Sequence, residues 1–140
     1  MRFLRPFSEQ LFALLRIVAG LLFAIHGAQK LFGAMGGTQV HEPLMVAAGV
    51  IELVCGLLVA GGLFTSVAAF LASGEMAAAF FKAHAPNGFN PVVNKGELAV
   101  VYSFLFLYIA ARGSGLWSLD AMMGKTKSKE PVMEGKRRDH

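Results

Sequence analysis

Charged and titratable side chains stand inside long apolar stretches of this sequence, where the burial of a charge is expensive. The residues that could do chemistry there are Arg16, His26, Lys30, Glu52, Glu75, Asn94 and Glu97. Carboxylates can take up and release protons, whereas histidine and lysine can donate hydrogen bonds to a carbonyl oxygen. Together, these residue types could bind a quinone and relay the protons that accompany its reduction.

The same side chains fall at helical spacing. His26, Gln29 and Lys30 are separated by three and four residues, so one face of a helix presents all of them. Glu52 and Glu75 each stand among small residues, nine residues from the expected start of a helix. A rise of about 1.5 Å per residue places both roughly 13 Å along their helices, at a similar depth. Two carboxylates at one depth tend to share a proton.

The segments that carry these residues are apolar. Hydrophobic residues make up 55% of the 140 residues, and charged residues make up 16%. Six of the thirteen Lys and Arg residues lie beyond residue 124, which leaves residues 11–111 almost without charge. Since soluble domains carry about 25% charged residues, this composition excludes ordinary soluble, disordered and fibrous proteins. It predicts an integral membrane protein whose basic end suits anionic lipid head groups rather than nucleic acid.

The cysteine content limits the redox chemistry of the chain itself. Cys55 is the single cysteine, which excludes a disulfide framework, a multi-cysteine metal site and an iron–sulfur cluster. The sequence also carries no flavin-binding motif. Haem between His26 and His84 is disfavoured, because haems in helix bundles are held by mid-helix ligands and His84 precedes a turn.

Apolar helices of about 20 residues can cross a bilayer. We expect four of them, at residues 9–33, 43–61, 65 to 82 or 84, and 90–111. Pro43 suits the first position of the second helix, and Thr65 and Ser66 can cap the third. The fourth reaches full length only if Asn90 caps it and Pro91 takes its first position. The predicted fold is an all-α integral membrane four-helix bundle.

Orientation follows from Lys and Arg, which concentrate on the cytoplasmic side of membrane proteins. With both termini inside, nine basic residues lie on the inner side and three on the outer side. The sequence therefore predicts an N-in, C-in topology. It comprises a cytoplasmic segment 1–8, a four-span domain 9–120 and a basic, disordered cytoplasmic tail 121–140.

Structural interpretations of the candidate residues stay open. Arg16 could serve only to neutralise Glu52 or Glu75 and to fix the helix packing. The ammonium group of Lys30 could extend to the head groups, and Glu97 could be an ordinary carboxylate at a helix start. Strips of small residues, such as those around the two central carboxylates, are typical of helix packing in membranes.

Several motifs, taken in order, resemble the DoxX family. They are LRIVAGLLF (15–23), HGAQKLFG (26–33), GVIE (49–52), GLL (56–58), GLFT (62–65), EM (75–76), PNGF (86–89), NKGEL (94–98) and WSLD (117–120). His84 precedes the PNGF motif at the spacing of the family. The resemblance covers residues 11–120, and the order and spacing of the motifs make it specific.

The resemblance implies a four-helix protein of the bacterial inner membrane. The family is named for a terminal quinol oxidase complex and includes a subunit of a thiosulfate:quinone oxidoreductase. Other relatives are associated with membrane oxidoreductase complexes that protect against oxidative and thiol stress. Since this chain has no soluble catalytic domain, oxidation of thiosulfate would need another subunit, soluble or membrane-bound.

We therefore expect an integral membrane subunit of a quinone-linked oxidoreductase system. Proton-handling roles fall to Glu52, Glu75, His26 and Glu97, and binding of the quinone falls to Arg16, His26, Lys30, Asn94 and Glu97. The alternatives are a small-solute or proton-coupled transporter, in homo-oligomeric form, and a scaffold for partner enzymes. A quinone site should open sideways to lipid, whereas a transport path should connect water on both faces. The sequence leaves open whether the chain is itself an enzyme.

Overall fold

The computed structural model describes residues 1–124, and all the regular elements in this range are helical. Residues 125–140, which hold most of the basic tail expected at 121–140, lie outside the described residues. The helices are α1 (Ser8–Phe32), α2 (Pro43–Gly61), α3 (Thr65–Ala79), α4 (Glu97–Arg112) and α5 (Leu119–Met122). The shorter turns are η1 (Arg2–Phe7), η2 (Ala34–Gly36), the π-helical η3 (Phe80–His84) and η4 (Ala85–Asn87).

Two helices within residues 1–124 are long and apolar enough to cross a membrane. They are Arg2–Phe32, in which η1 continues directly into α1, and Pro43–Gly61. Their ends confirm the signals in the sequence. Pro43 opens α2, and Gly33 and Gly62 end α1 and α2 in the left-handed conformation, with φ of 64° and 70°.

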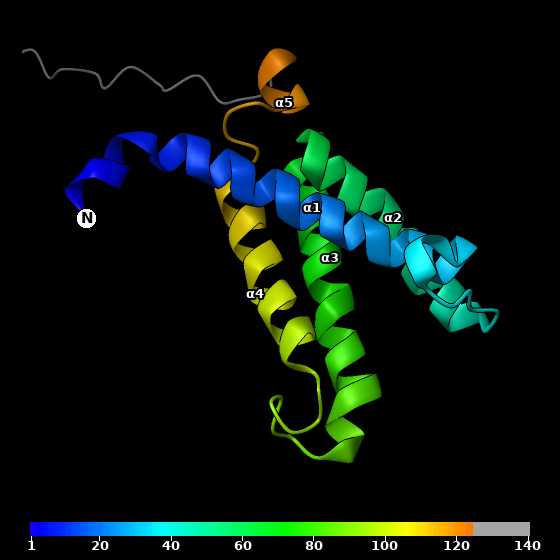
Figure 1. Cartoon of the computed structure of the whole chain (residues 1–140). Helices are drawn as coiled ribbons and strands as arrows, with labels where there is room; N and C mark the ends of the chain where they lie inside the picture. The colour runs from blue at the N-terminus through cyan, green and yellow to red at the C-terminus, as the bar shows by residue number, and fades with distance from the viewer. Residues whose placement is uncertain (125–140) are drawn as a thin grey trace, which may run out of the picture.

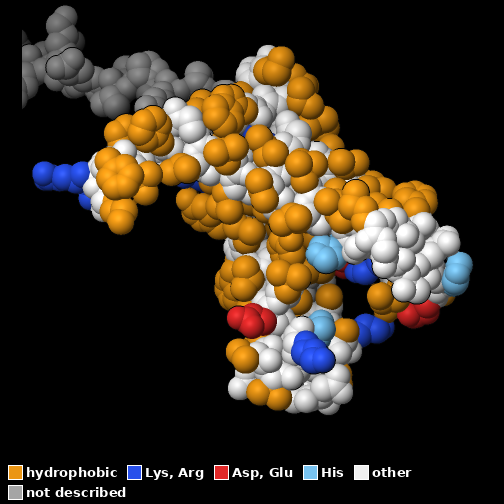
Figure 2. Space-filling view, viewed as in Figure 1, with side chains coloured by type: hydrophobic (Ala, Val, Ile, Leu, Met, Phe, Trp, Pro, Cys, Tyr) orange, Lys and Arg blue, Asp and Glu red, His pale blue; other side chains and the backbone are white. Residues whose placement is uncertain are grey.

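The helices form two pairs, α1 with α2 and α3 with α4, which diverge from each other (Figure 1). The pairs are joined mainly where α2 meets α3. Large apolar side chains cover the outer faces of the helices (Figure 2). In a bilayer, these faces would contact lipid tails without a hydrophobic penalty.

Glycines bring α1 and α2 into backbone contact. A Cβ atom on Gly20 would lie 2.5 Å from the backbone nitrogen of Ala60, and one on Gly56 would lie 2.5 Å from that of Ala24. Gly27 approaches Leu53 in the same way. The glycines of the predicted small-residue strip on α2 therefore serve helix packing, since lipid supplies no hydrophobic force to hold two helices together.

Serines join α3 to α4. The hydroxyl of Ser73 donates to the carbonyl oxygen of Ser103 at 2.7 Å. The hydroxyl of Ser103 donates to the carbonyl oxygen of Ser73 at 3.2 Å. These reciprocal bonds give each hydroxyl an acceptor, which lipid tails could not supply. They fix the register of the second pair.

The expected start of the fourth helix was wrong. Asn90 and Pro91 lie in a turn, where the side chain of Asn90 accepts from the backbone of Val92, and α4 begins only at Glu97. Lys95 adopts a φ of 63°, which no helix continues through. The 16 residues of α4 measure about 24 Å, less than a typical apolar bilayer core of about 30 Å.

Candidate functional site

A cavity of about 970 Å³ lies where the two helix pairs diverge. Its walls come from α1, α2, α3, η3 and the N-terminal half of α4, together with Lys95 before it. Figure 2 shows this face hollowed between the pairs, with acidic, basic and histidine side chains beside the hollow. The cavity is lined mainly by apolar side chains, with a few convergent polar groups, which is typical of a site for a small molecule.

An ion pair forms the polar centre of the cavity. The Nζ atom of Lys30 lies 2.5 Å from Oε1 of Glu52. The side chain of Glu52 is 2% exposed, whereas that of Lys30 is 25% exposed. The depth argument thus placed Glu52 correctly inside the protein. The structural interpretation of Lys30, in which its ammonium reaches the head groups alone, is wrong.

Glu75 faces this ion pair from α3. It interacts electrostatically with both Glu52 and Lys30. The Oε2 atoms of Glu52 and Glu75 are buried and have no hydrogen-bond partner among the described residues. The structure therefore brings two carboxylates and one ammonium group together and leaves a carboxylate oxygen of each acid unpaired.

Aromatic rings form a wall beside the charged centre. The ring of His26 meets Tyr102 edge-on, with centroids 6.4 Å apart, and Tyr102 stacks on Phe106 at 5.5 Å. Phe23 packs against the rings of Tyr102 and Phe106. Phe104 of α4 does not contribute to this wall, because it faces outward and is 69% exposed.

The structure places three of the predicted site residues outside the cavity lining: Asn94, Glu97 and Arg16. Asn94 is buried in the loop before α4, where its side chain donates to the carbonyl of Gly88 and accepts from the backbone of Gly96. Glu97 is exposed at the first turn of α4. The amide nitrogen and the amide oxygen of Asn94 therefore both hold the loop in shape.

Four further ionisable residues lie at the rim of the cavity and were not among the predicted site residues. They are Glu42, Lys82, His84 and Lys95. His84 makes a 3.2 Å contact from its Nδ1 atom to the carbonyl of Asn94, which ties η3 to the following loop. In the sequence, His84 is weighed as a haem ligand and Lys95 stands in the NKGEL motif, whereas Glu42 and Lys82 are marked only by their position near the ends of the expected spans.

Arg16 lies at the opposite end of the helix pairs and pairs with neither central carboxylate. Its guanidinium donates to the carbonyl oxygens of Val59 and Ala60 at 2.7 and 2.8 Å, and to those of Leu116 and Trp117 at 3.1 and 2.8 Å. The interpretation in which Arg16 neutralises Glu52 or Glu75 is therefore wrong. The cation instead satisfies the carbonyls at the C-terminus of α2, where the helix dipole favours it.

Asp120 completes this end, which we call the closed end and define by Arg16, Asp120, Glu9 and Arg112. The carboxylate of Asp120 accepts from the backbone of Phe64 and Thr65, at 3.1 and 3.2 Å. It thereby caps α3, a role that the sequence had assigned to Thr65 and Ser66. The WSLD motif was the signal, since its aspartate can reach a helix start distant in the sequence.

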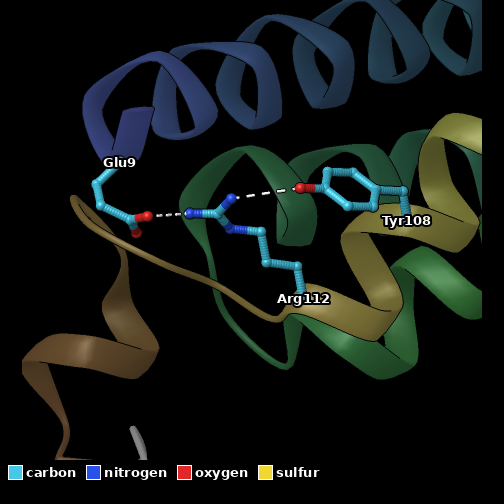
Figure 3. Close-up of polar contacts among 3 residues, drawn as sticks. All are labelled: Glu9, Tyr108 and Arg112. Carbon is cyan, nitrogen blue, oxygen red and sulfur yellow. Dashed lines mark hydrogen bonds and ion pairs between the residues drawn. The ribbon is translucent and has the colours of Figure 1, made fainter. Parts of the chain in front are cut away.

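Figure 3 shows the contacts of Arg112 with Glu9 and Tyr108 at the closed end. Arg112 of α4 donates to the carboxylate of Glu9 on α1 and to the hydroxyl of Tyr108. Its guanidinium also lies over the ring of Phe12, 4.1 Å from the centroid. These contacts hold α4 against the start of α1.

A layer of fully buried apolar residues separates the closed end from the cavity. Its members are Val59, Ala69, Phe106 and Ile109, each 0% exposed. Charge is therefore concentrated in two separate places along the helix pairs. The polar centre of the cavity does not continue through the described residues to Arg16.

Comparison with known proteins agrees with the motifs. The DoxX family model matches residues 11–85. An uncharacterized protein of Haemophilus influenzae is 42% identical over 125 residues, which cover 84% of this chain and 93% of that protein. No solved structure matches the chain. On the extent of these matches, the chain is a membrane protein that belongs to the DoxX family.

Proposed function

We propose that this chain is a subunit of a quinone-linked oxidoreductase system in the bacterial inner membrane and that its cavity binds the quinone. The observation that carries the proposal is the cavity itself, in which Lys30, Glu52 and Glu75 meet beside an aromatic wall. A quinone needs an apolar site for its ring and groups that exchange hydrogen bonds and protons at its two oxygens.

The residues of the cavity fit such a ligand. When bound, a quinone would supply a carrier of two electrons and two protons. Lys30 and His26 can donate a hydrogen bond to an oxygen of the ring, and Glu52 and Glu75 can hold or release a proton beside it. Tyr102 offers an aromatic face at the wall. The apolar layer behind the cavity lies between these groups and the charges of the closed end.

The electrons would come from a carrier in a partner subunit, soluble or membrane-bound. This chain would then provide the membrane site, orient the ring and exchange protons with it. These separate roles agree with the resemblance to a family that includes a subunit of a thiosulfate:quinone oxidoreductase.

A topology of four spans with both termini in the cytoplasm suits this role. Residues 65–84 form a continuous helical stretch through α3 and η3, about 30 Å long at an α-helical rise. Although α4 is shorter, its loop is held against η3 by the contact between His84 and Asn94. In this orientation, the closed end faces the cytoplasm and the cavity lies toward the outer leaflet.

The one-ended cavity favours a ligand site over a transport path. Transport would require a polar route from one face to the other. Here the polar centre ends at Val59, Ala69 and Phe106, which are fully buried. A scaffold without a ligand would, in turn, have no use for unpaired buried carboxylate oxygens.

The test is the quinone content of the full-length protein, purified in mild detergent and measured per chain after solvent extraction. We expect close to one quinone per chain in the wild type, and a clear loss in His26→Ala and Glu75→Gln. Glu9→Gln is the matched control, because it neutralises a carboxylate at the closed end. A wild-type content no higher than that of the co-purified lipid would overturn the proposal.

A further inference from the structure

Two buried carboxylate oxygens in the cavity need hydrogen-bond donors. Oε2 of Glu52 and Oε2 of Glu75 are buried without a partner among the described residues, and Glu52 is only 2% exposed. A buried acceptor left unpaired loses the hydrogen bonds that it made in water. Each of these oxygens therefore favours a ligand that brings a donor to it.

The basic groups nearby do not supply these donors in the structure. Lys30 is bound through Oε1 of Glu52, the other oxygen of that carboxylate. Lys82 and Lys95 lie at the rim with exposed side chains. The ring of His26 faces Tyr102. The buried cavity atoms that lack a hydrogen-bond partner among the described residues are therefore two acceptors on facing helices, α2 and α3.

The two forms of a quinone differ in what they offer to such acceptors. The oxidised ring carries carbonyl oxygens, which only accept hydrogen bonds and would repel a carboxylate oxygen. The reduced ring carries two hydroxyls, and each can donate. Hydrogen bonds from a hydroxyl to a carboxylate are short and about twice as strong as those between neutral groups.

From this arrangement, we propose that the cavity selects the reduced, hydroquinone form of its ligand over the oxidised form through Glu52 and Glu75. The inference rests on the proposed function, since it assumes that the ligand is a quinone. It goes beyond that function by assigning the two carboxylates as the residues that distinguish the redox states. The ligand class is an apolar ring that bears two hydroxyl donors.

The experiment compares durohydroquinone with duroquinone, which share one tetramethylated ring. Binding of each to the full-length protein in mild detergent is measured anaerobically by isothermal titration calorimetry. We expect the hydroquinone to bind at least about tenfold more tightly, the gain given by roughly one additional strong hydrogen bond. Equal affinities, or tighter binding of the quinone, would overturn the inference and leave the proposed function standing.

Substitutions locate the preference. Glu75→Gln should reduce the ratio of the two affinities, because the amide can donate to the carbonyl of the oxidised ring. Glu52→Gln should act in the same direction. Glu9→Gln, the matched control at the closed end, should keep the wild-type ratio. If Glu75→Gln leaves the ratio of the two affinities unchanged, the carboxylate oxygens do not distinguish the hydroquinone from the quinone.

A ligand-based arm needs no variant and so holds even if a substituted protein fails to fold. The dimethyl ether of durohydroquinone keeps the ring but has no hydroxyl donor. It should bind no more tightly than duroquinone, and binding equal to that of the hydroquinone would contradict the proposal. If none of the three compounds binds the wild type, the proposed function itself fails, which is a different outcome from equal binding.

Discussion

At the closed end, Nη1 and Nη2 of the fully buried Arg16 donate to four backbone carbonyl oxygens and only its Nε lacks a partner among the described residues, whereas in the cavity Glu52 and Glu75 each keep a buried acceptor oxygen without one. Both regions hold charge inside an apolar protein. The first arranges its acceptors around a cation as part of the fold. The second leaves acceptors open at a cavity, at a cost in stability that a ligand can offset.

This difference separates charge that builds the fold from charge that is available for binding. Arg16 links α1 to the end of α2 and to the segment before α5. Lys30 and Glu52 link α1 to α2 as well, but at the open side of the helix pairs. Arg16 at the closed end and Glu75 in the cavity should therefore respond in opposite ways to apolar substitution.

The largest effect is expected for Arg16→Met. The substitution removes the donor to four backbone carbonyl oxygens, of which only that of Val59 keeps another hydrogen bond among the described residues, from the backbone of Gly62. It should therefore lower the free energy of unfolding by about 3 kcal/mol. The measurement is thermal unfolding in detergent, monitored by circular dichroism. Arg112→Met, at a partly exposed arginine, serves as the control and should cost much less. Equal losses of unfolding free energy in both variants would mean that the burial of Arg16 does not increase its contribution to stability.

Gly56→Val should come next, because it forces α1 and α2 apart. The new Cβ atom would meet the backbone nitrogen of Ala24 at 2.5 Å, where neither helix can yield without a shift. We expect a loss of about 1–3 kcal/mol, as for other overpacked sites. Gly74→Ala is the control, since nothing lies within 4 Å of its added Cβ. A normal melting temperature for Gly56→Val would show that the contact between α1 and α2 is loose.

Glu75→Met should change stability in the other direction. Removing a carboxylate that has an unpaired buried oxygen should raise the free energy of unfolding by about 1 kcal/mol, as often happens when a functional residue is replaced. The same thermal unfolding experiment measures it, alongside the quinone content, which should fall. Glu52→Met should instead be destabilising, because it strips Lys30 of its partner. Destabilisation by Glu75→Met would assign that carboxylate to the fold rather than to a ligand.

Local signals were sufficient to predict the first two helices. Pro43 and the glycines at positions 33 and 62 act within one helical turn of themselves, so their effect is legible in the sequence. The start of α4 depends on contacts from elsewhere. A Cβ on Gly96 would meet Phe80 and His84 of η3 at 2.7 and 2.8 Å, so the loop before α4 is shaped by the end of the preceding helix. The sequence does not show these contacts between Gly96 and η3, so its pattern predicts a helix start at Asn90 and Pro91.

The candidate site divides in the same way. Helical spacing and depth brought His26, Lys30, Glu52 and Glu75 to one cavity, because the helices that carry them are regular. The partners of Arg16 could not be predicted, since a sequence shows which side chains carry charge but not which backbone carbonyls end a helix nearby. Glu97 could not be placed either, because its position depends on where α4 begins.

The smallest effect is expected at the rim of the closed end. Glu9 contacts Arg112, but its side chain is 54% exposed (Figure 3). Solvent screens such a pair, so Glu9→Gln should cost less than about 1 kcal/mol, with the loss shrinking further at high salt. Thermal unfolding at low and high salt measures both. A loss as large as that of Arg16→Met would mean that the closed end acts as one coupled network, in which Arg112, Tyr108 and Phe12 depend on Glu9. In that case, the contrast between the two ends would lie in their cooperativity and not in the burial of single charges.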